Sequence, residues 1–116
     1  IGQTNLLEGS FDGSNIVLRG FSAGVPVQGT PAFPQEAYQV SIRPQSLRLG
    51  QPTPDTLPVG PVSVMSRTYL GEYWDYQVRP VSGGDPLRVH APPSHVLEVG
   101  HESLLCIDPR GVALVN

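Results

Sequence analysis

The chain has 116 residues and a formal net charge of −3, its seven cationic side chains are all arginine, and it contains one cysteine. Without lysine it can hold neither a Walker A phosphate loop nor a lysine Schiff base, and a single cysteine excludes an internal disulfide. Thirteen glycines and thirteen prolines disfavour helix interiors, so the composition predicts an all-β chain of short strands and turns.

The first residues predict a β-hairpin. Residues 5–11 and 15–20 are short runs rich in apolar side chains, and they flank Asp12-Gly13. Asp-Gly between two such runs is typical of a tight hairpin turn, because glycine tolerates positive φ. Residues 21–35 are rich in glycine and proline, so we expect mainly a loop with a short extended piece at 25–28.

A further strand is predicted at residues 38–43, where Val40 and Ile42 alternate with polar residues. Pro44 cannot donate to a sheet ladder, so the strand is expected to end there. Residues 51–61 carry four prolines and are predicted to form an extended connector on the surface.

The most informative stretch is residues 60–80, which predicts two strands joined at Leu70-Gly71-Glu72. In the second strand Trp74, Tyr76 and Val78 alternate with charged or polar residues, and successive side chains on a strand point to opposite faces. We therefore expect these three side chains to form the inner wall of a barrel and the alternate face to be solvated.

Three more strands are predicted C-terminal to this hairpin, at residues 87–91, 102–108 and 111–115. Residues 60–116 then hold about five strands with short connections, which fits a five-stranded OB-like antiparallel barrel. The predicted organisation is an N-terminal strand segment, residues 1–50, that completes or extends a barrel formed by residues 60–116.

Three motifs, in order along nearly the whole chain, resemble a known family. IGQTNLLEG at residues 1–9 resembles the segment at which the ATPase domain of an ABC importer continues into its regulatory region. IRPQSLRL at 42–49 is similar to a strand that follows that ATPase domain, and residues 61–114 are similar to the C-terminal TOBE (transport-associated OB) module. The chain thus resembles the regulatory domain of importers of the polyamine, iron and maltose type.

The resemblance implies a non-catalytic regulatory and dimerisation domain of the ATP-binding subunit of a solute importer, for example one for spermidine and putrescine. ATP and Mg²⁺ would bind to an ATPase domain upstream of Ile1, so this piece of a longer protein would need no cofactor and would be no enzyme by itself. The implied partners are a second copy of the subunit, the upstream ATPase domain and, indirectly, the membrane subunits. The implied location is cytoplasmic, peripheral to the membrane.

Five charged or tyrosine side chains are candidates for an interface or ligand contact: Arg43, Arg67, Tyr69, Glu72 and Tyr73. Tyr69 and Tyr73 are expected to be exposed, and tyrosine is enriched at protein interfaces. Arg43, Arg48 and Arg67 are the residues from which an anion site or a seam of ion pairs would be built.

Metal binding and catalysis are not predicted. His90, His95 and His101 lack the i, i+4 spacing of a helical metal site, and a Pro-Pro pair separates the first two, so surface histidines are favoured. Asp75 and Glu72 are a possible carboxylate pair, but no arrangement of nucleophile, base and orienting residue accompanies them.

Two alternatives stay open. The first is a small-ligand-sensing OB module for the transported solute or an oxyanion; molybdate is not expected, because Ser66-Arg67-Thr68 only partly matches the short motif of molybdate-sensing relatives. The second, less favoured, is an OB-type nucleic-acid binder whose aromatic side chains stack on bases. Seven arginines on an acidic chain argue against it, so no nucleic-acid partner is expected.

Overall fold

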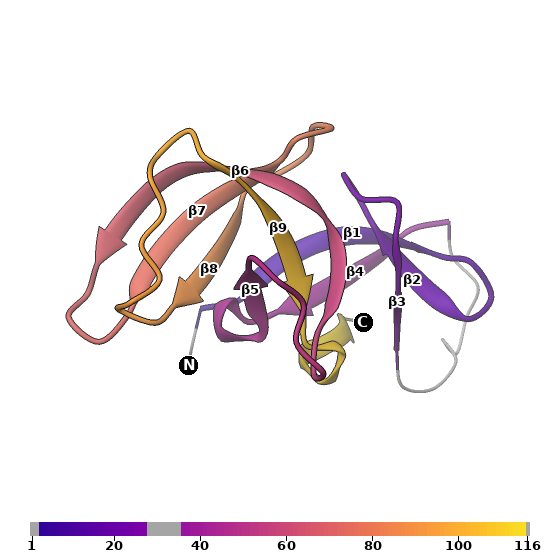
Figure 1. Ribbon diagram of the computed structural model, residues 1–116. Helices are drawn as coiled ribbons and strands as arrows, with labels where there is room; N and C mark the ends of the chain where they lie inside the picture. Colours follow the sequence, from indigo (N-terminus) through magenta and orange to yellow (C-terminus); the bar gives the residue numbers. More distant parts are fainter. Residues whose placement is uncertain (1–2, 28–35, 116) are drawn as a thin grey trace.

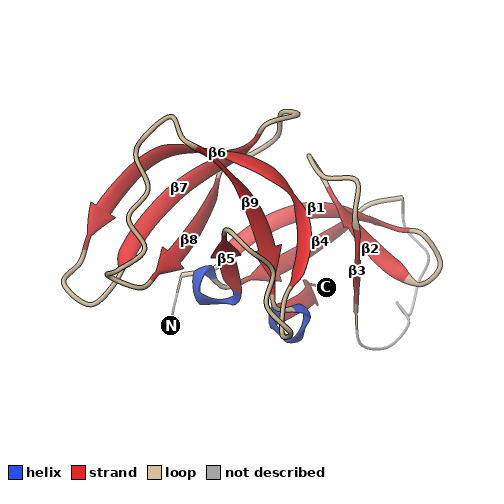
Figure 2. Cartoon of the chain, in the orientation of Figure 1, coloured by secondary structure: helices blue, strands red, loops and turns tan. Residues whose placement is uncertain are grey.

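The protein, described by a computed structural model over residues 3–27 and 36–115, is built almost entirely from β-strands (Figures 1 and 2). The described residues contain only two short 3₁₀ helices, η1 (Pro44–Ser46) and η2 (Pro109–Gly111). The all-β prediction is therefore confirmed. The second half of the loop predicted at 21–35 lies outside the described residues.

The first sheet joins the N-terminal strands to the last strand of the chain. Its order is β10-β4-β1-β2-β3, all antiparallel, with β1 (Asn5–Phe11), β2 (Asn15–Leu18), β3 (Gly24–Pro26), β4 (Tyr38–Ile42) and β10 (Val112–Val115). The predicted Asp-Gly hairpin is confirmed between β1 and β2. Backbone N–H groups of Asn15 and Ser14 donate to the Asp12 carboxylate at 2.8 and 3.1 Å and lower the pKa of Asp12.

The second sheet curls into an OB-like barrel that is nearly closed. Its order is β5-β9-β6-β7-β8, with β5 (Leu47–Leu49), β6 (Leu57–Tyr69), β7 (Trp74–Pro80), β8 (Leu87–Ala91) and β9 (Glu102–Ile107). The edge strands β5 and β8 lie close together, and the long strand β6 curves across the top of the barrel in Figure 1. The OB-like antiparallel barrel with additional N-terminal strands is confirmed.

The strands of residues 60–116 do not all belong to the barrel, which differs from the prediction that these residues form its five strands. The last strand, β10, pairs with β4 in the first sheet, and β5 supplies the fifth strand of the barrel by pairing with β9. The inward-facing Val112 and Leu114 lie opposite Ile42 and Val40, so β10 extends the buried face of β4. The division into residues 1–50 and 60–116 stays a prediction, and backbone ladders cross it twice.

The proline-rich connector is shorter than expected. Strand β6 begins at Leu57, so the second half of residues 51–61 pairs with β9 rather than forming a surface linker. The ladder shifts register between Pro58 and Gly60. Such a bulge interrupts the ladder where a proline has no N–H to donate, and this allows a strand in a proline-rich sequence.

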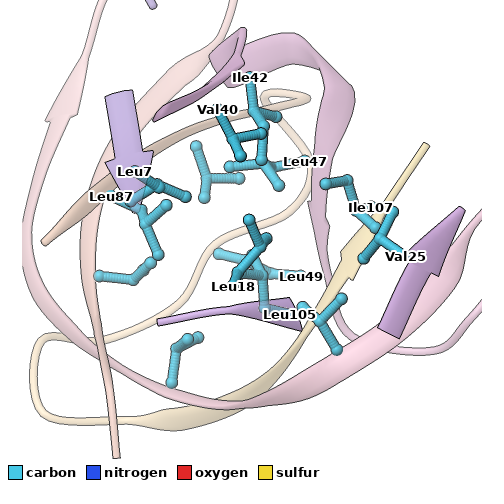
Figure 3. Packing of buried hydrophobic residues seen from close by; sticks show 14 of the residues in the cluster. Leu7, Leu18, Val25, Val40, Ile42, Leu47, Leu49, Leu87, Leu105 and Ile107 are labelled. Atoms are coloured by element: carbon cyan, nitrogen blue, oxygen red, sulfur yellow. The ribbon is translucent and has the colours of Figure 1, made fainter. Parts of the chain in front are cut away.

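One hydrophobic cluster fills the space between the two sheets (Figure 3). The cluster includes Leu7, Leu18 and Val40 from the first sheet together with Leu49 and Leu105 from the second. Because a single core serves both sheets, the described residues pack as one unit. The lone cysteine, Cys106, is buried on β9, and burial raises the pKa of its thiol.

The β6–β7 hairpin follows the prediction closely. Tyr76 and Val78 are fully buried and Trp74 is half-buried against the core. Gly71 has a φ of 92° at the turn, a conformation that favours glycine. The alternate face of β7 is thereby turned outward.

Candidate functional site

An open pocket of about 880 Å³ lies beside the outward face of β7 and β8. That volume is within the range of small-molecule sites. Its lining combines cationic, acidic and aromatic side chains that come from the residue before η1, from β5, β7 and β8, and from the β6–β7 turn: Arg43, Arg48, Tyr73, Asp75, Arg88 and His90.

The register of two neighbouring strands sets the polar floor of this pocket. Asp75 of β7 is opposite His90 of β8, and Gln77 is opposite Arg88. The residues between them, Tyr76 and Val89, point into the core. Alternation therefore places the acid, the histidine and the arginine on the same outward face.

Asp75 is the electrostatic centre of the pocket. Its side chain is only 11% exposed, its Oδ2 accepts a hydrogen bond from Arg88 Nη2 at 2.9 Å, and its Oδ1 lies 3.6 Å from His90 Nε2. That second distance is too long for a hydrogen bond. Within the described part of the chain, Asp75 Oδ1 and Arg88 Nε are buried polar atoms without a partner.

The first strand holds Arg88 in place. The Asn5 side chain donates to the Arg88 carbonyl at 2.9 Å and accepts from the Arg88 N–H at 2.8 Å. Gln3 Oε1 accepts from Arg88 Nη1 at 2.8 Å. The N-terminal strand thus connects to the edge of the barrel and orients one wall of the pocket.

Two further arginines reach the pocket from the segment that links the sheets. Arg48 donates to the backbone carbonyls of Gln45 and Leu47, the latter at 3.0 Å, which leaves most of its five N–H donors free. Arg43 is exposed and has no ion pair or side-chain hydrogen bond with any described residue. The two cationic groups are therefore available to an anion.

His90 is half-buried, which differs from the surface histidine expected. Its ring lies 4.2 Å from the Tyr73 ring, centroid to centroid. Burial lowers the pKa of His90, and this outweighs the attraction of Asp75; the Arg88 charge lowers the pKa further. At neutral pH His90 is therefore a neutral group beside the Asp75–Arg88 pair.

The lowered pKa of His90 predicts a pH-dependent stability. The unfolded chain takes up a proton on this ring near the ordinary value of 6.5, before the folded protein does, so the free energy of unfolding should fall as pH drops below that value. His90→Gln is expected to flatten this dependence in denaturant titrations between about pH 7.5 and about pH 5. The exposed His101→Gln serves as the control, and an equal flattening there would contradict the assignment.

The other predicted contact residues, Arg67, Tyr69 and Glu72, are not among the residues that line this pocket. Tyr69 is 51% exposed and packs on Trp74 with ring centroids 4.9 Å apart, and Glu72 is exposed at the turn. Arg67 donates to the Leu97 carbonyl at 3.0 Å and lies over the Trp74 ring at 5.3 Å. Of the three arginines considered for an anion site, Arg43 and Arg48 share the pocket and Arg67 does not.

Sequence reasoning missed the strongest part of the site. Arg88 and His90 were not linked to Asp75, because β7 and β8 had no assigned register. The turn after Pro80 could have revealed this register. If Val78 is paired with Leu87 across the turn, Asp75 lies opposite His90.

The described residues contain no group of three or more His, Cys, Asp or Glu side chains placed to hold a metal ion. A helix long and apolar enough to cross a membrane is also lacking in the part of the chain that the structure describes.

Comparison with known proteins gives a family and a fold. The family profile of the TOBE domain matches residues 40–115. The crystal structure of the cytoplasmic molybdate-binding protein ModG, with molybdate bound, is similar with a TM-score of 0.69 and 12% sequence identity, over 95% of this chain and 94% of that chain. At this identity the likeness shows a shared fold. None of the curated proteins gives a significant match.

Proposed function

The chain belongs to the TOBE domain family, and on that basis we propose that it is the non-catalytic regulatory and dimerisation domain of the ATP-binding subunit of an ABC-type solute importer. As part of such a subunit it lies in the cytoplasm, peripheral to the membrane. ATP and Mg²⁺ belong to the upstream ATPase domain, and the solute is of the class carried by polyamine, iron or maltose importers.

The observation that carries this proposal is the position of the family match. It runs from β4 through the linking segment to β10, and so includes the strands that tie the two sheets together. The motif at residues 42–49 contains η1 and β5, and the motif at residues 1–9 contributes to β1, which pairs with β4. The motifs that resemble those of importers therefore lie in regular secondary structure of the fold and not in surface loops.

We propose that the domain pairs with a second copy through the tip of the β6–β7 hairpin. Tyr69 and Leu70 are about half exposed there, and the acidic Glu72 stands beside them. Aromatic and aliphatic side chains at an exposed turn, rimmed by a charge, have the composition of a small interface. Pairing across a two-fold axis would hold two upstream ATPase domains together.

The native gene is expected to encode a Walker A loop, a signature motif and a Walker B strand upstream of Ile1. In the full subunit, Tyr69→Arg should raise the dimer dissociation constant about tenfold or more in sedimentation experiments. The similarly exposed Val81→Arg, away from the hairpin tip, is the matched control. Absence of the ATPase motifs upstream would overturn the proposal.

The pocket favours a second candidate function, the sensing of a small ligand. Arg43 and Arg48 offer unpaired cationic donors in a cavity of small-molecule size. The structural neighbour ModG is a molybdate-binding protein, which supports anion binding by a domain of this fold. Regulation of an importer by a bound solute or oxyanion is compatible with the first proposal.

A further inference from the structure

From the pocket chemistry we propose that the ligand is a small organic acid carrying two anionic groups and a hydroxyl or ammonium donor, rather than a bare tetrahedral oxyanion. This inference rests on the second candidate function, that the domain binds a small ligand. It goes further by naming the chemical class and by assigning Asp75 as the residue that selects it.

The charge balance of the lining indicates two anionic groups. Of the described residues, three arginines and one acidic side chain, Asp75, line the pocket, and Asp75 is already paired with Arg88. Arg43 and Arg48 therefore remain as two cations that form no ion pair with an acidic side chain of the lining. Guanidinium groups bind carboxylates through parallel N–H donors, so a dicarboxylate matches this surplus.

Asp75 argues against a bare oxyanion. A carboxylate lining the pocket repels an anion that offers only acceptor oxygens, and its Oδ1 has no donor. An unsatisfied buried acceptor carries a desolvation cost that a ligand donor would remove. The neighbouring His90 Nε2 lies 3.6 Å from Oδ1, too far for a hydrogen bond, so this oxygen lacks the donor that a ligand hydroxyl or ammonium would supply.

The size and the apolar lining agree with an organic ligand. The cavity of about 880 Å³ far exceeds a single tetrahedral oxyanion. Its wall includes Leu70, Ala91 and Pro92, which offer no hydrogen-bond donors from their side chains to oxyanion oxygens. A carbon skeleton can lie against these residues while its charged ends reach the arginines.

The test is calorimetric titration of the chain with five probes: succinate, malate, aspartate, sulfate and molybdate. Malate and aspartate carry a donor that succinate lacks, so each should bind about tenfold or more tightly than succinate. Arg43→Ala and Arg48→Ala should each weaken all three carboxylates by about tenfold. Arg79→Ala, which removes an exposed charge from β7 outside the pocket, should leave binding unchanged.

Asp75→Asn isolates the selecting residue. The variant should lose most of the preference for malate over succinate, and its affinity for succinate should rise, because the repelling carboxylate is gone and Arg88 loses its ion pair. Loss of succinate binding in this variant would overturn the proposal, because Asp75 would then only shape the pocket. Equal binding of malate and succinate to the unmodified chain would overturn it too.

The remaining outcomes separate this inference from the function on which it rests. Sulfate or molybdate binding as tightly as malate would overturn the organic-acid class and leave small-ligand sensing in place. No binding of any of the five probes would overturn both.

Discussion

Replacing Tyr76 by alanine is expected to lower the free energy of unfolding by about 4 kcal/mol. The Tyr76 ring is fully buried in the barrel. Its hydroxyl donates to the His95 carbonyl and accepts from the Leu97 N–H, both at 2.8 Å, so it fastens the loop after β8 to the core. The substitution removes a large apolar surface and leaves both backbone groups without their partner. Urea unfolding followed by fluorescence measures the change.

Two control variants separate the stability contributed by the Tyr76 ring from that of its hydroxyl and from the effect of removing any tyrosine. Tyr76→Phe keeps the ring and should cost about 2 kcal/mol, because the partly buried His95 carbonyl and Leu97 N–H lose their hydrogen-bond partner. Tyr69→Ala, at an exposed tyrosine on the neighbouring strand, should cost less than about 1 kcal/mol. Equal losses for Tyr76→Ala and Tyr69→Ala would contradict the assigned core position.

The second large effect is expected at Asn5, whose replacement by alanine should cost about 3 kcal/mol. This side chain satisfies both the N–H and the carbonyl of Arg88 and is 8% exposed. Its loss leaves two backbone groups at the junction of β1 and β8 without a partner and frees the backbone that carries the pocket arginine. Chemical denaturation measures the loss.

Gln39→Ala provides the comparison for Asn5. Gln39 lies on the exposed side of β4, and truncation there should change the free energy of unfolding by less than about 0.5 kcal/mol. An Asn5→Ala variant as stable as Gln39→Ala would show that the Asn5–Arg88 bridge adds no stability.

Local pattern predicted the strands well and their partners less well. The Asp12-Gly13 turn and the alternation of Trp74, Tyr76 and Val78 each specify a hairpin, because both signals lie within a few neighbouring residues. The partner of β10 is not encoded near it in the sequence. It is chosen by the buried face of β4, which lies at the other end of the chain.

The part of the candidate site that could be predicted consists of single residues whose side-chain type suggests a contact. Arg43 and Tyr73 were identified as contact residues, and both line the pocket. Asp75, Arg88 and His90 are brought together by the register between β7 and β8, which cannot be read from any single stretch of sequence. Arg67 was also predicted as a contact residue. Its guanidinium instead donates to the Leu97 carbonyl and lies over the Trp74 ring, and neither contact can be read from the sequence around Arg67.

Strands β5 and β10 each pair within a sheet built mainly from the other half of the chain, so neither half contains a complete sheet. A cut in the exposed stretch 51–55 would therefore leave two peptides held together by two backbone ladders and a shared core. Such peptides should complement each other when mixed and remain unfolded when alone. The same geometry permits two intact copies to exchange their last strands, each β10 lying beside the β4 of the other copy.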